Sequence, residues 1–186
     1  MTDCSIAHEL LLLRRRLAWV QAELGDYFHA TTDKQAVRDA VYEVIARHDF
    51  SIQATIMEKA KAYPNIKSSQ ARFYQHGWLY HFRHGMKKDI VTGDDVLIKA
   101  ASIGVRKERK SFTGAVDNVM AQTLKANRWR TDFAPCVSDP CLQVADYCAW
   151  AIQKRWETGD SRSYDLIAAK INYEYDLWEH GTHLQY

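Results

Sequence analysis

Residues Ser138–Trp150, SDPCLQVADYCAW, join a helix start to two acidic side chains. Asp139 followed by Pro140 predicts the helix start, because an Asp side chain accepts from the unpaired N–H groups of a first turn and proline suits the first helical position. One stripe of this helix carries residues at helical spacing, namely Asp139, Gln143, Asp146 and Trp150. An acid beside a core-facing helix surface needs a polar or cationic neighbour, so Asp146 is the first candidate functional residue.

Apolar periodicity on either side of this segment predicts alternating strands and helices. Strands are expected at residues 27–30, 51–57, 96–103 and 129–137. Helices are expected at 8–24, at 33–47 with Thr32 and Asp33 as caps, from Ser68 or Ser69 to 84, up to residue 124, and from 140 to the end of the chain. The alternation favours an α/β fold with helical crossovers, and the chain length favours a single domain, 1–186.

Composition excludes some classes of protein. The 186 residues carry a net charge of only +2, which argues neither for nor against nucleic acid. No apolar run reaches the about 20 residues that span a bilayer. The first residues lack the basic start of a signal peptide, so we expect a cytoplasmic protein with no membrane partner. The four cysteines, Cys4, Cys136, Cys141 and Cys148, are expected to be reduced thiols, since their spacing matches no usual zinc pattern.

The order of motifs resembles a known family. The most specific match is Ser138–Tyr147, in which Ser-Asp is followed by Leu-Gln-x-Ala-Asp. Weaker matches are Tyr27–Ala30, Val37–Asp39, Glu58–Lys59, Tyr63–Pro64, Asp160–Tyr164 and Tyr173–Trp178. Together they resemble the domain-of-unknown-function 3800 family of bacteria and phages over nearly the whole chain. The resemblance implies an RNase H-like α/β fold, with a mixed sheet and helices on both faces.

The start of the chain departs from this family pattern. Family members usually begin with a strand carrying Asp-Glu-Ser-Gly and then a hairpin, ahead of the first long helix. Here Met1 stands only a few residues before the helix predicted from His8. The N-terminal hairpin strands, and the first acid of a metal site, are therefore expected to be missing or truncated. A late start codon, a natural truncation that has lost the chemistry, and a second chain that completes the sheet all stay open.

The resemblance also implies a catalytic site. RNase H-like nucleases hold two divalent cations, about 3.5–4 Å apart, between clustered carboxylates. Mg²⁺ or Mn²⁺ would bind Asp146 and Asp139, although the latter has more weight as a helix cap because the two acids are two helical turns apart. His29 matches the family's Phe-His element and is a candidate acid, base or phosphate donor; a structural histidine is the alternative. Lys59, at a strand end, would meet a phosphate or neutralise Asp146, unless it is simply solvated.

Two further groups of residues are compatible with nucleic-acid binding. The predicted backbone-binding cluster is Arg106, Lys107, Arg109 and Lys110, for which a solvated helix face is the alternative. A stripe of rings that would either stack bases or fill the core consists of Tyr74, Trp78, His81 and Phe82. The sequence thus supports two hypotheses. One is a metal-dependent nucleic-acid phosphodiesterase, and the other is a non-catalytic binding or assembly module that dimerises or pairs with a partner chain through its sheet edge.

Overall fold

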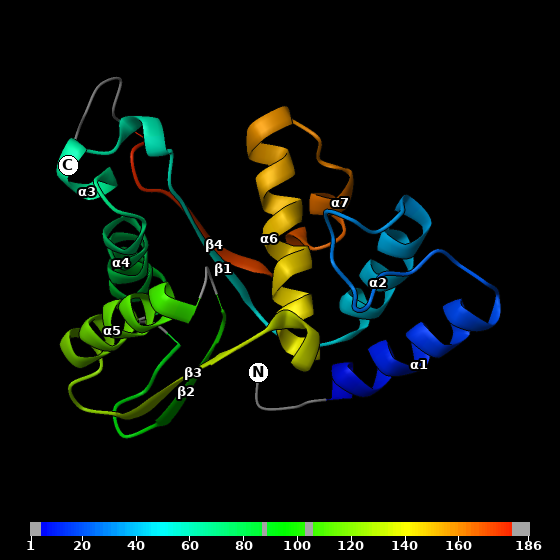
Figure 1. Ribbon diagram of the computed structural model, residues 1–186, viewed down its shortest axis with the longest axis horizontal. Helices are drawn as coiled ribbons and strands as arrows, with labels where there is room; N and C mark the ends of the chain where they lie inside the picture. The colour runs from blue at the N-terminus through cyan, green and yellow to red at the C-terminus, as the bar shows by residue number, and fades with distance from the viewer. Residues whose placement is uncertain (1–4, 87–88, 103–105, 180–186) are drawn as a thin grey trace. The chain divides into compact units, whose positions relative to one another are not determined.

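The computed structural model describes residues 5–86, 89–102 and 106–179 (Figure 1). It confirms a mixed α/β class with small parallel sheets. The chain divides into two compact units, the first formed by residues 1–52 and 134–172 and the second by 53–133 and 173–186. The expected single domain stays a prediction. Within the described residues, no helix is both long and apolar enough to cross a membrane.

The first unit is built from helices. Its three long helices are α1 (Ser5–Trp19), α2 (Gln35–Arg47) and α6 (Pro140–Thr158), followed by the short α7 (Arg162–Asp165). Helix α1 packs against both α2 and α6 (Figure 1). The buried side chains of these helices include Leu10, Leu13, Val41, Ile45, Val144 and Ala151. Burying an aliphatic side chain of this size contributes about 1.5–3 kcal/mol, so helix packing is the main stabilising term in this unit.

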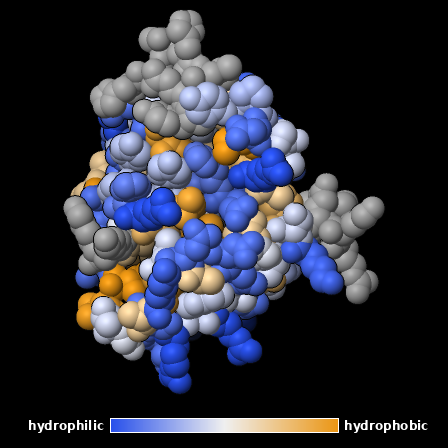
Figure 2. All heavy atoms as spheres, turned by 90° about the vertical axis from the view of Figure 1, so that its left-hand side faces the viewer, coloured by the Kyte–Doolittle hydropathy of each residue, from blue (hydrophilic) through white to orange (hydrophobic). Residues whose placement is uncertain are grey.

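The second unit contains most of the residues of both sheets. Strand β1 (Ile52–Ile56) pairs with β4 (Ile171–Asp176), and β2 (Asp95–Ala101) pairs with β3 (Arg128–Ala134). Its helical segments are the turn Lys59–Lys61, α3 (Pro64–Lys67), α4 (Gln70–Tyr80), the wide turn His81–Gly85 and α5 (Arg106–Thr123). Viewed from the side of α4 and α5, the surface is mostly hydrophilic with scattered apolar side chains (Figure 2).

Ion pairs between β2 and β3 indicate that these two strands are parallel. Arg128 pairs with Asp95, and Lys99 pairs with Asp132, and both partners are 33 residues apart in sequence. A constant separation along two strands means that they run in the same direction, which requires a long crossover connection. Helix α5 supplies that crossover.

The aromatic stripe of α4 belongs to the core of the second unit. Phe82 is buried with Ile98, Val116 and Met120, and Tyr74 and Trp78 pack against this cluster. His81 bonds through Nδ1 to Thr55 Oγ1 at 3.0 Å, and burial lowers the pKa of its imidazole. Of the two interpretations that the sequence left open, the structure therefore supports core packing rather than base stacking.

Several predicted elements are wrong at their ends or in kind. Helix α1 ends at Trp19, not near residue 24, because Gln21 adopts a left-handed φ of 56°. Ala22 N then donates to Leu17 O at 2.9 Å, and Gln21 N donates to Ala18 O at 3.1 Å, which is the hydrogen-bond pattern of a Schellman helix end. The expected strand at 27–30 is a loop, and the chain after α6 includes strand β4 rather than helices alone.

Candidate functional site

The loop at residues 27–33 is held against α6 by side chains, not by a neighbouring strand. Three consecutive backbone N–H groups each donate to a side-chain oxygen: Phe28 N to Gln143 Oε1 at 3.3 Å, His29 N to Asp33 Oδ2 at 2.8 Å, and Ala30 N to Asp146 Oδ2 at 3.0 Å. These bonds explain why the predicted strand is absent, since the donors that would form a ladder are already paired. Two of the three acceptors lie on α6.

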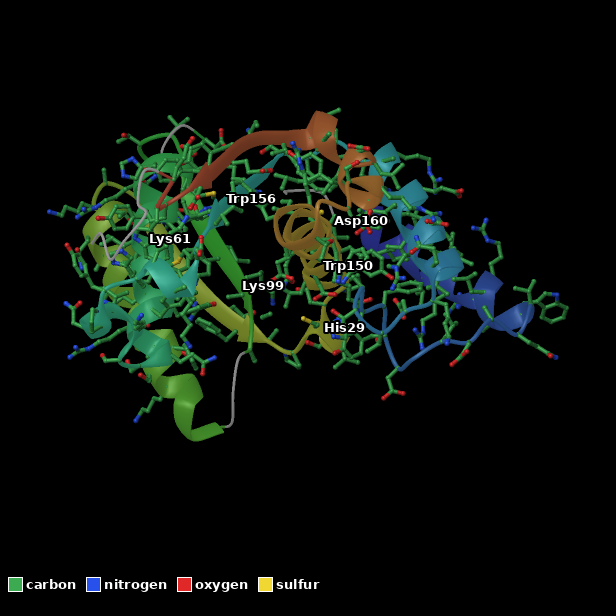
Figure 3. All side chains as sticks on the ribbon, turned by 90° about the horizontal axis from the view of Figure 1, so that it is seen from above. His29, Lys61, Lys99, Trp150, Trp156 and Asp160 are labelled. Carbon is green, nitrogen blue, oxygen red and sulfur yellow. The ribbon has the colours of Figure 1, made fainter. Side chains whose placement is uncertain are left out.

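His29 and Asp146 form the central pair of this site. His29 Nδ1 lies 2.8 Å from Asp146 Oδ2, although the two residues are 117 positions apart in the sequence. Their side chains are 37% and 27% exposed, so solvent and small ligands reach both. Because the carboxylate accepts the Nδ1 proton, the neutral imidazole presents an unprotonated Nε2 to a substrate. Figure 3 places His29 beside α6 in the same region as Trp150.

A buried layer of hydrogen bonds supports the pair from below. Asp33 is 6% exposed, and its Oδ2 accepts from the Tyr147 hydroxyl as well as from the loop backbone. Tyr42 in turn donates through its hydroxyl to Tyr147 O at 2.9 Å, and the two rings meet edge to face. Burial raises the pKa of both phenols, so they remain protonated donors near neutral pH. The predicted capping role of Asp33 is wrong: α2 has Lys34 at its N-cap, with no side-chain cap.

Arg38 of α2 fixes the end of the same loop. Its guanidinium donates through Nη1 to Ala30 O at 3.0 Å and through Nη2 to Gln35 Oε1 at 3.0 Å. The guanidinium carbon also lies 4.8 Å from the centre of the Trp150 ring, a cation–π contact. Trp150 is one helical turn beyond Asp146, so the polar stripe of α6 continues into this contact.

Asp139 acts as the cap that its position predicts. It is the N-cap of α6, and its Oδ1 accepts from Cys141 N at 2.9 Å. Gln143 is 8% exposed and bonds at both ends, since its Nε2 donates to Cys136 O at 3.0 Å while its Oε1 accepts from the loop. This side chain therefore joins the start of α6 to the loop rather than lying on a solvated surface.

The three described cysteines are free thiols, as expected for Cys136, Cys141 and Cys148. Burial and the nearby negative charge of Asp146 raise the pKa of Cys136, and burial raises that of Cys148 to about 12. Raised values disfavour the thiolate, which is the form that binds metals and attacks electrophiles. Cys4 lies outside the described residues.

The side chains around Asp146 do not by themselves form the expected two-metal centre. Within the described part of the chain, no three His, Cys, Asp or Glu side chains are placed to hold one metal ion. Asp146 Oδ2 is already shared by His29 and Ala30 N, and Asp139 Oδ1 is used in capping. Binding of Mg²⁺ or Mn²⁺ by Asp146 and Asp139 therefore stays a prediction, and no chemical step is derived through a metal.

The other predicted site residues belong to the second unit. Lys59 is exposed at the start of the turn Lys59–Lys61. The basic cluster lies at the first turns of α5, where Lys110 is exposed. The side chains of Arg106, Lys107 and Arg109 lie outside what the structure describes. Roles for these residues in phosphate or nucleic-acid binding stay predictions.

Comparison with protein-family models, curated proteins and solved structures found no match. The site is therefore defined by its own geometry. Sequence reasoning had singled out His29, Asp146 and Gln143, and the structure brings all three together. It had missed the supporting residues Asp33, Arg38, Tyr42 and Tyr147. Arg38 and Tyr147 lie within the matched segments Val37–Asp39 and Ser138–Tyr147, and Asp33 was expected only as a helix cap. No sequence signal pointed to Tyr42.

Proposed function

We propose that the chain is a nucleic-acid phosphodiesterase in which His29 transfers the proton and Asp146 orients the His29 imidazole. The observation that carries this proposal is the bond of 2.8 Å between His29 Nδ1 and Asp146 Oδ2. The resemblance to the RNase H-like domain-of-unknown-function 3800 family supports the choice of substrate class. The family places the same two residues in its motifs, and the α/β class agrees with it.

The chemistry follows from the state of the imidazole. With its Nδ1 proton donated to Asp146, His29 accepts a proton through Nε2 from the attacking hydroxyl or water. The carboxylate stabilises the imidazolium that forms, and the imidazolium then returns the proton to the leaving oxygen. Ala30 N holds the Asp146 oxygen in place at 3.0 Å, so the pair is positioned before substrate binds. Arg38 of α2 brings a positive charge to the end of this loop through its bond to Ala30 O at 3.0 Å.

Cleavage of end-labelled single-stranded RNA and DNA tests the proposal. The wild-type chain is assayed with Mg²⁺, with Mn²⁺ and with a chelator, next to His29→Gln and Asp146→Asn. Loss of a positioned acid–base group lowers a rate by about 10²–10⁴-fold, so both variants should fall by that range. The matched controls are His8→Gln and Asp49→Asn, two exposed positions of the same unit, which should retain the full rate.

The assays with Mg²⁺, with Mn²⁺ and with chelator distinguish two forms of the proposal. Cleavage that needs Mg²⁺ or Mn²⁺ and disappears in Asp146→Asn supports a metal role for this acid. Cleavage in chelator that disappears in His29→Gln supports the His29 and Asp146 pair alone. Equal rates in wild type and both variants would overturn the proposal.

A binding or assembly module is the second candidate, and the outer face of α1 favours it. Large apolar side chains are exposed on α1 at Leu11, Leu12 and Trp19, and directly after the helix at Val20, with exposed fractions of 49%, 48%, 88% and 64%. Exposed apolar side chains gathered on one element are typical of interaction surfaces. A chain that cleaves neither nucleic acid under any condition and is dimeric by light scattering would support this candidate instead.

A further inference from the structure

A second series of neighbouring polar side chains lies between the start of α1 and the end of α2, and it shares no residue with the proposed nuclease site. Ser5 Oγ lies 3.2 Å from His48 Nδ1, and His48 Nε2 lies 3.1 Å from Glu9 Oε1. Arg47 Nη2 donates to the other Glu9 oxygen, Oε2, at 2.7 Å. A hydroxyl, an imidazole and a carboxylate thus stand in series, with His48 Nε2 at ion-pair distance from Glu9 but without a hydrogen bond among the described residues. The order of the groups is the one that activates a serine.

The carboxylate determines which nitrogen of His48 carries the proton. The negative charge of Glu9, 3.1 Å from Nε2, favours the neutral tautomer with its proton on Nε2 and leaves Nδ1 as the acceptor facing Ser5. The hydrogen bond from Arg47, together with the Arg47 positive charge, lowers the pKa of Glu9. The acid therefore remains a carboxylate at neutral pH. In this tautomer Nδ1 can act as a general base toward Ser5.

Exposure of the three side chains suits attack on an external substrate. Ser5 is exposed, the Glu9 side chain is 36% exposed, and the His48 side chain is only 14% exposed. A substrate can reach the hydroxyl while the base is shielded.

We infer that Ser5, His48 and Glu9 form an esterase-type site for carboxylic esters, in which Ser5 is the nucleophile, His48 its base and Glu9 the positioning residue. Ser5 Oγ bonds to the ester carbon while its proton passes to His48 Nδ1. The bond from carbon to the alcohol oxygen breaks, and the alcohol leaves with that proton. Water then attacks the acyl-serine, giving its proton through His48 to Ser5 Oγ and releasing the carboxylic acid.

The charged groups around His48 come from three elements. Glu9 faces it from α1, Arg47 adjoins it on α2, and Lys170 donates through Nζ to the His48 backbone oxygen. Only an unprotonated imidazole nitrogen can accept the Ser5 proton, so the rate of serine modification should fall in acid.

A fluorophosphonate probe tests the inference, because it forms a bond from Ser5 Oγ to phosphorus with loss of fluoride. Intact mass and peptide mapping should find one adduct, on Ser5. Ser5→Ala should abolish it, and His48→Gln should slow it by about 10²-fold. Glu9→Gln should slow formation of the adduct and shift the pH at which the labelling rate is half-maximal. Turnover of p-nitrophenyl acetate should fall in the same order.

Two controls keep the test decisive. Ser51→Ala, at another exposed serine of the same unit, should label like wild type. His29→Gln should also label like wild type, so failure of the nuclease proposal would leave this result unaffected. A folded wild-type chain that acquires no adduct at Ser5, or a labelling rate that His48→Gln does not change, would overturn the inference.

Discussion

Asp33→Ala should destabilise the first unit strongly, although Asp33 is neither a predicted catalytic residue nor a helix cap. This side chain is 6% exposed, and its Oδ2 accepts both from His29 N at 2.8 Å and from the Tyr147 hydroxyl. Alanine removes the acceptor and leaves both donors in place. A buried donor without a partner costs about 1–3 kcal/mol. The Tyr147 hydroxyl is buried and His29 N is partly buried, so the free energy of unfolding should fall by at least about 1–3 kcal/mol.

Tyr147→Phe separates the contribution of the Tyr147 hydroxyl from that of His29 N. It removes the hydroxyl donor and keeps the ring, so by itself it should cost about 1 kcal/mol. When Asp33 is already alanine, the hydroxyl has lost its acceptor, and removing it should cost less or even stabilise the chain. The double-mutant cycle should therefore give a coupling energy within the range of about 0.5–3 kcal/mol that contacting residues show.

Urea denaturation followed by tryptophan fluorescence and circular dichroism measures all four chains of the cycle. Asp49→Ala is the matched control, because Asp49 is exposed and surface changes of this kind stay within about 0.5 kcal/mol. Asp33→Ala should also increase the reactivity of His29 toward diethyl pyrocarbonate, because the loop backbone loses a bond. A cost for Asp33→Ala no larger than that of the control, or fully additive costs in the cycle, would refute this account of the buried layer.

Two further predictions concern other parts of the chain. Gly159 ends α6 at a left-handed φ of 73°, and nothing lies within 4 Å of an added Cβ, so Gly159→Ala should cost about 1–2 kcal/mol in urea unfolding. The control is Gly114→Ala, inside α5, where an added Cβ also meets nothing within 4 Å but φ is not positive. This change should be neutral or stabilising. Burial lowers the pKa of His81, so folding stability should be full above its unfolded value of about 6.5 and fall as the pH drops below it. Measured at pH 7.5 and 5.5, His81→Gln should show a smaller loss than wild type, with the residual slope coming from His76, whose pKa burial also lowers.

Local signals predicted much of the helical structure correctly. The Asp139 cap, the Ser69 cap of α4 and the inward side chains of α2 all follow from spacing within a few residues. Strand β4 was missed, although Ile171–Asp176 alternates aromatic and polar side chains, because a four-residue helix and two short turns precede it. Short segments of this kind carry too little periodicity to distinguish strand from helix.

Contacts between distant residues account for the remaining differences. Residues 27–30 have the aromatic content of a strand, yet their N–H groups bond to side chains, two of which lie more than a hundred residues away. The supporting role of Asp33 depends on Tyr147, 114 positions later. Periodicity within a window cannot identify such partners. The family resemblance placed His29 and Asp146 in one hypothesis, because its motifs are spread along the whole chain rather than within one window.

The anchoring of the 27–33 loop to α6 also determines when the site can form during synthesis. The acceptors for Phe28 N and Ala30 N lie 115 and 116 residues downstream. Closing a chain segment of this length is slow compared with forming a local helix, and a ribosome releases the chain from the N-terminus first. The nascent chain therefore exposes the His29 loop until α6 has been translated. Proteolysis or chaperone binding on stalled chains should change sharply once residues up to about 158 have emerged from the ribosome.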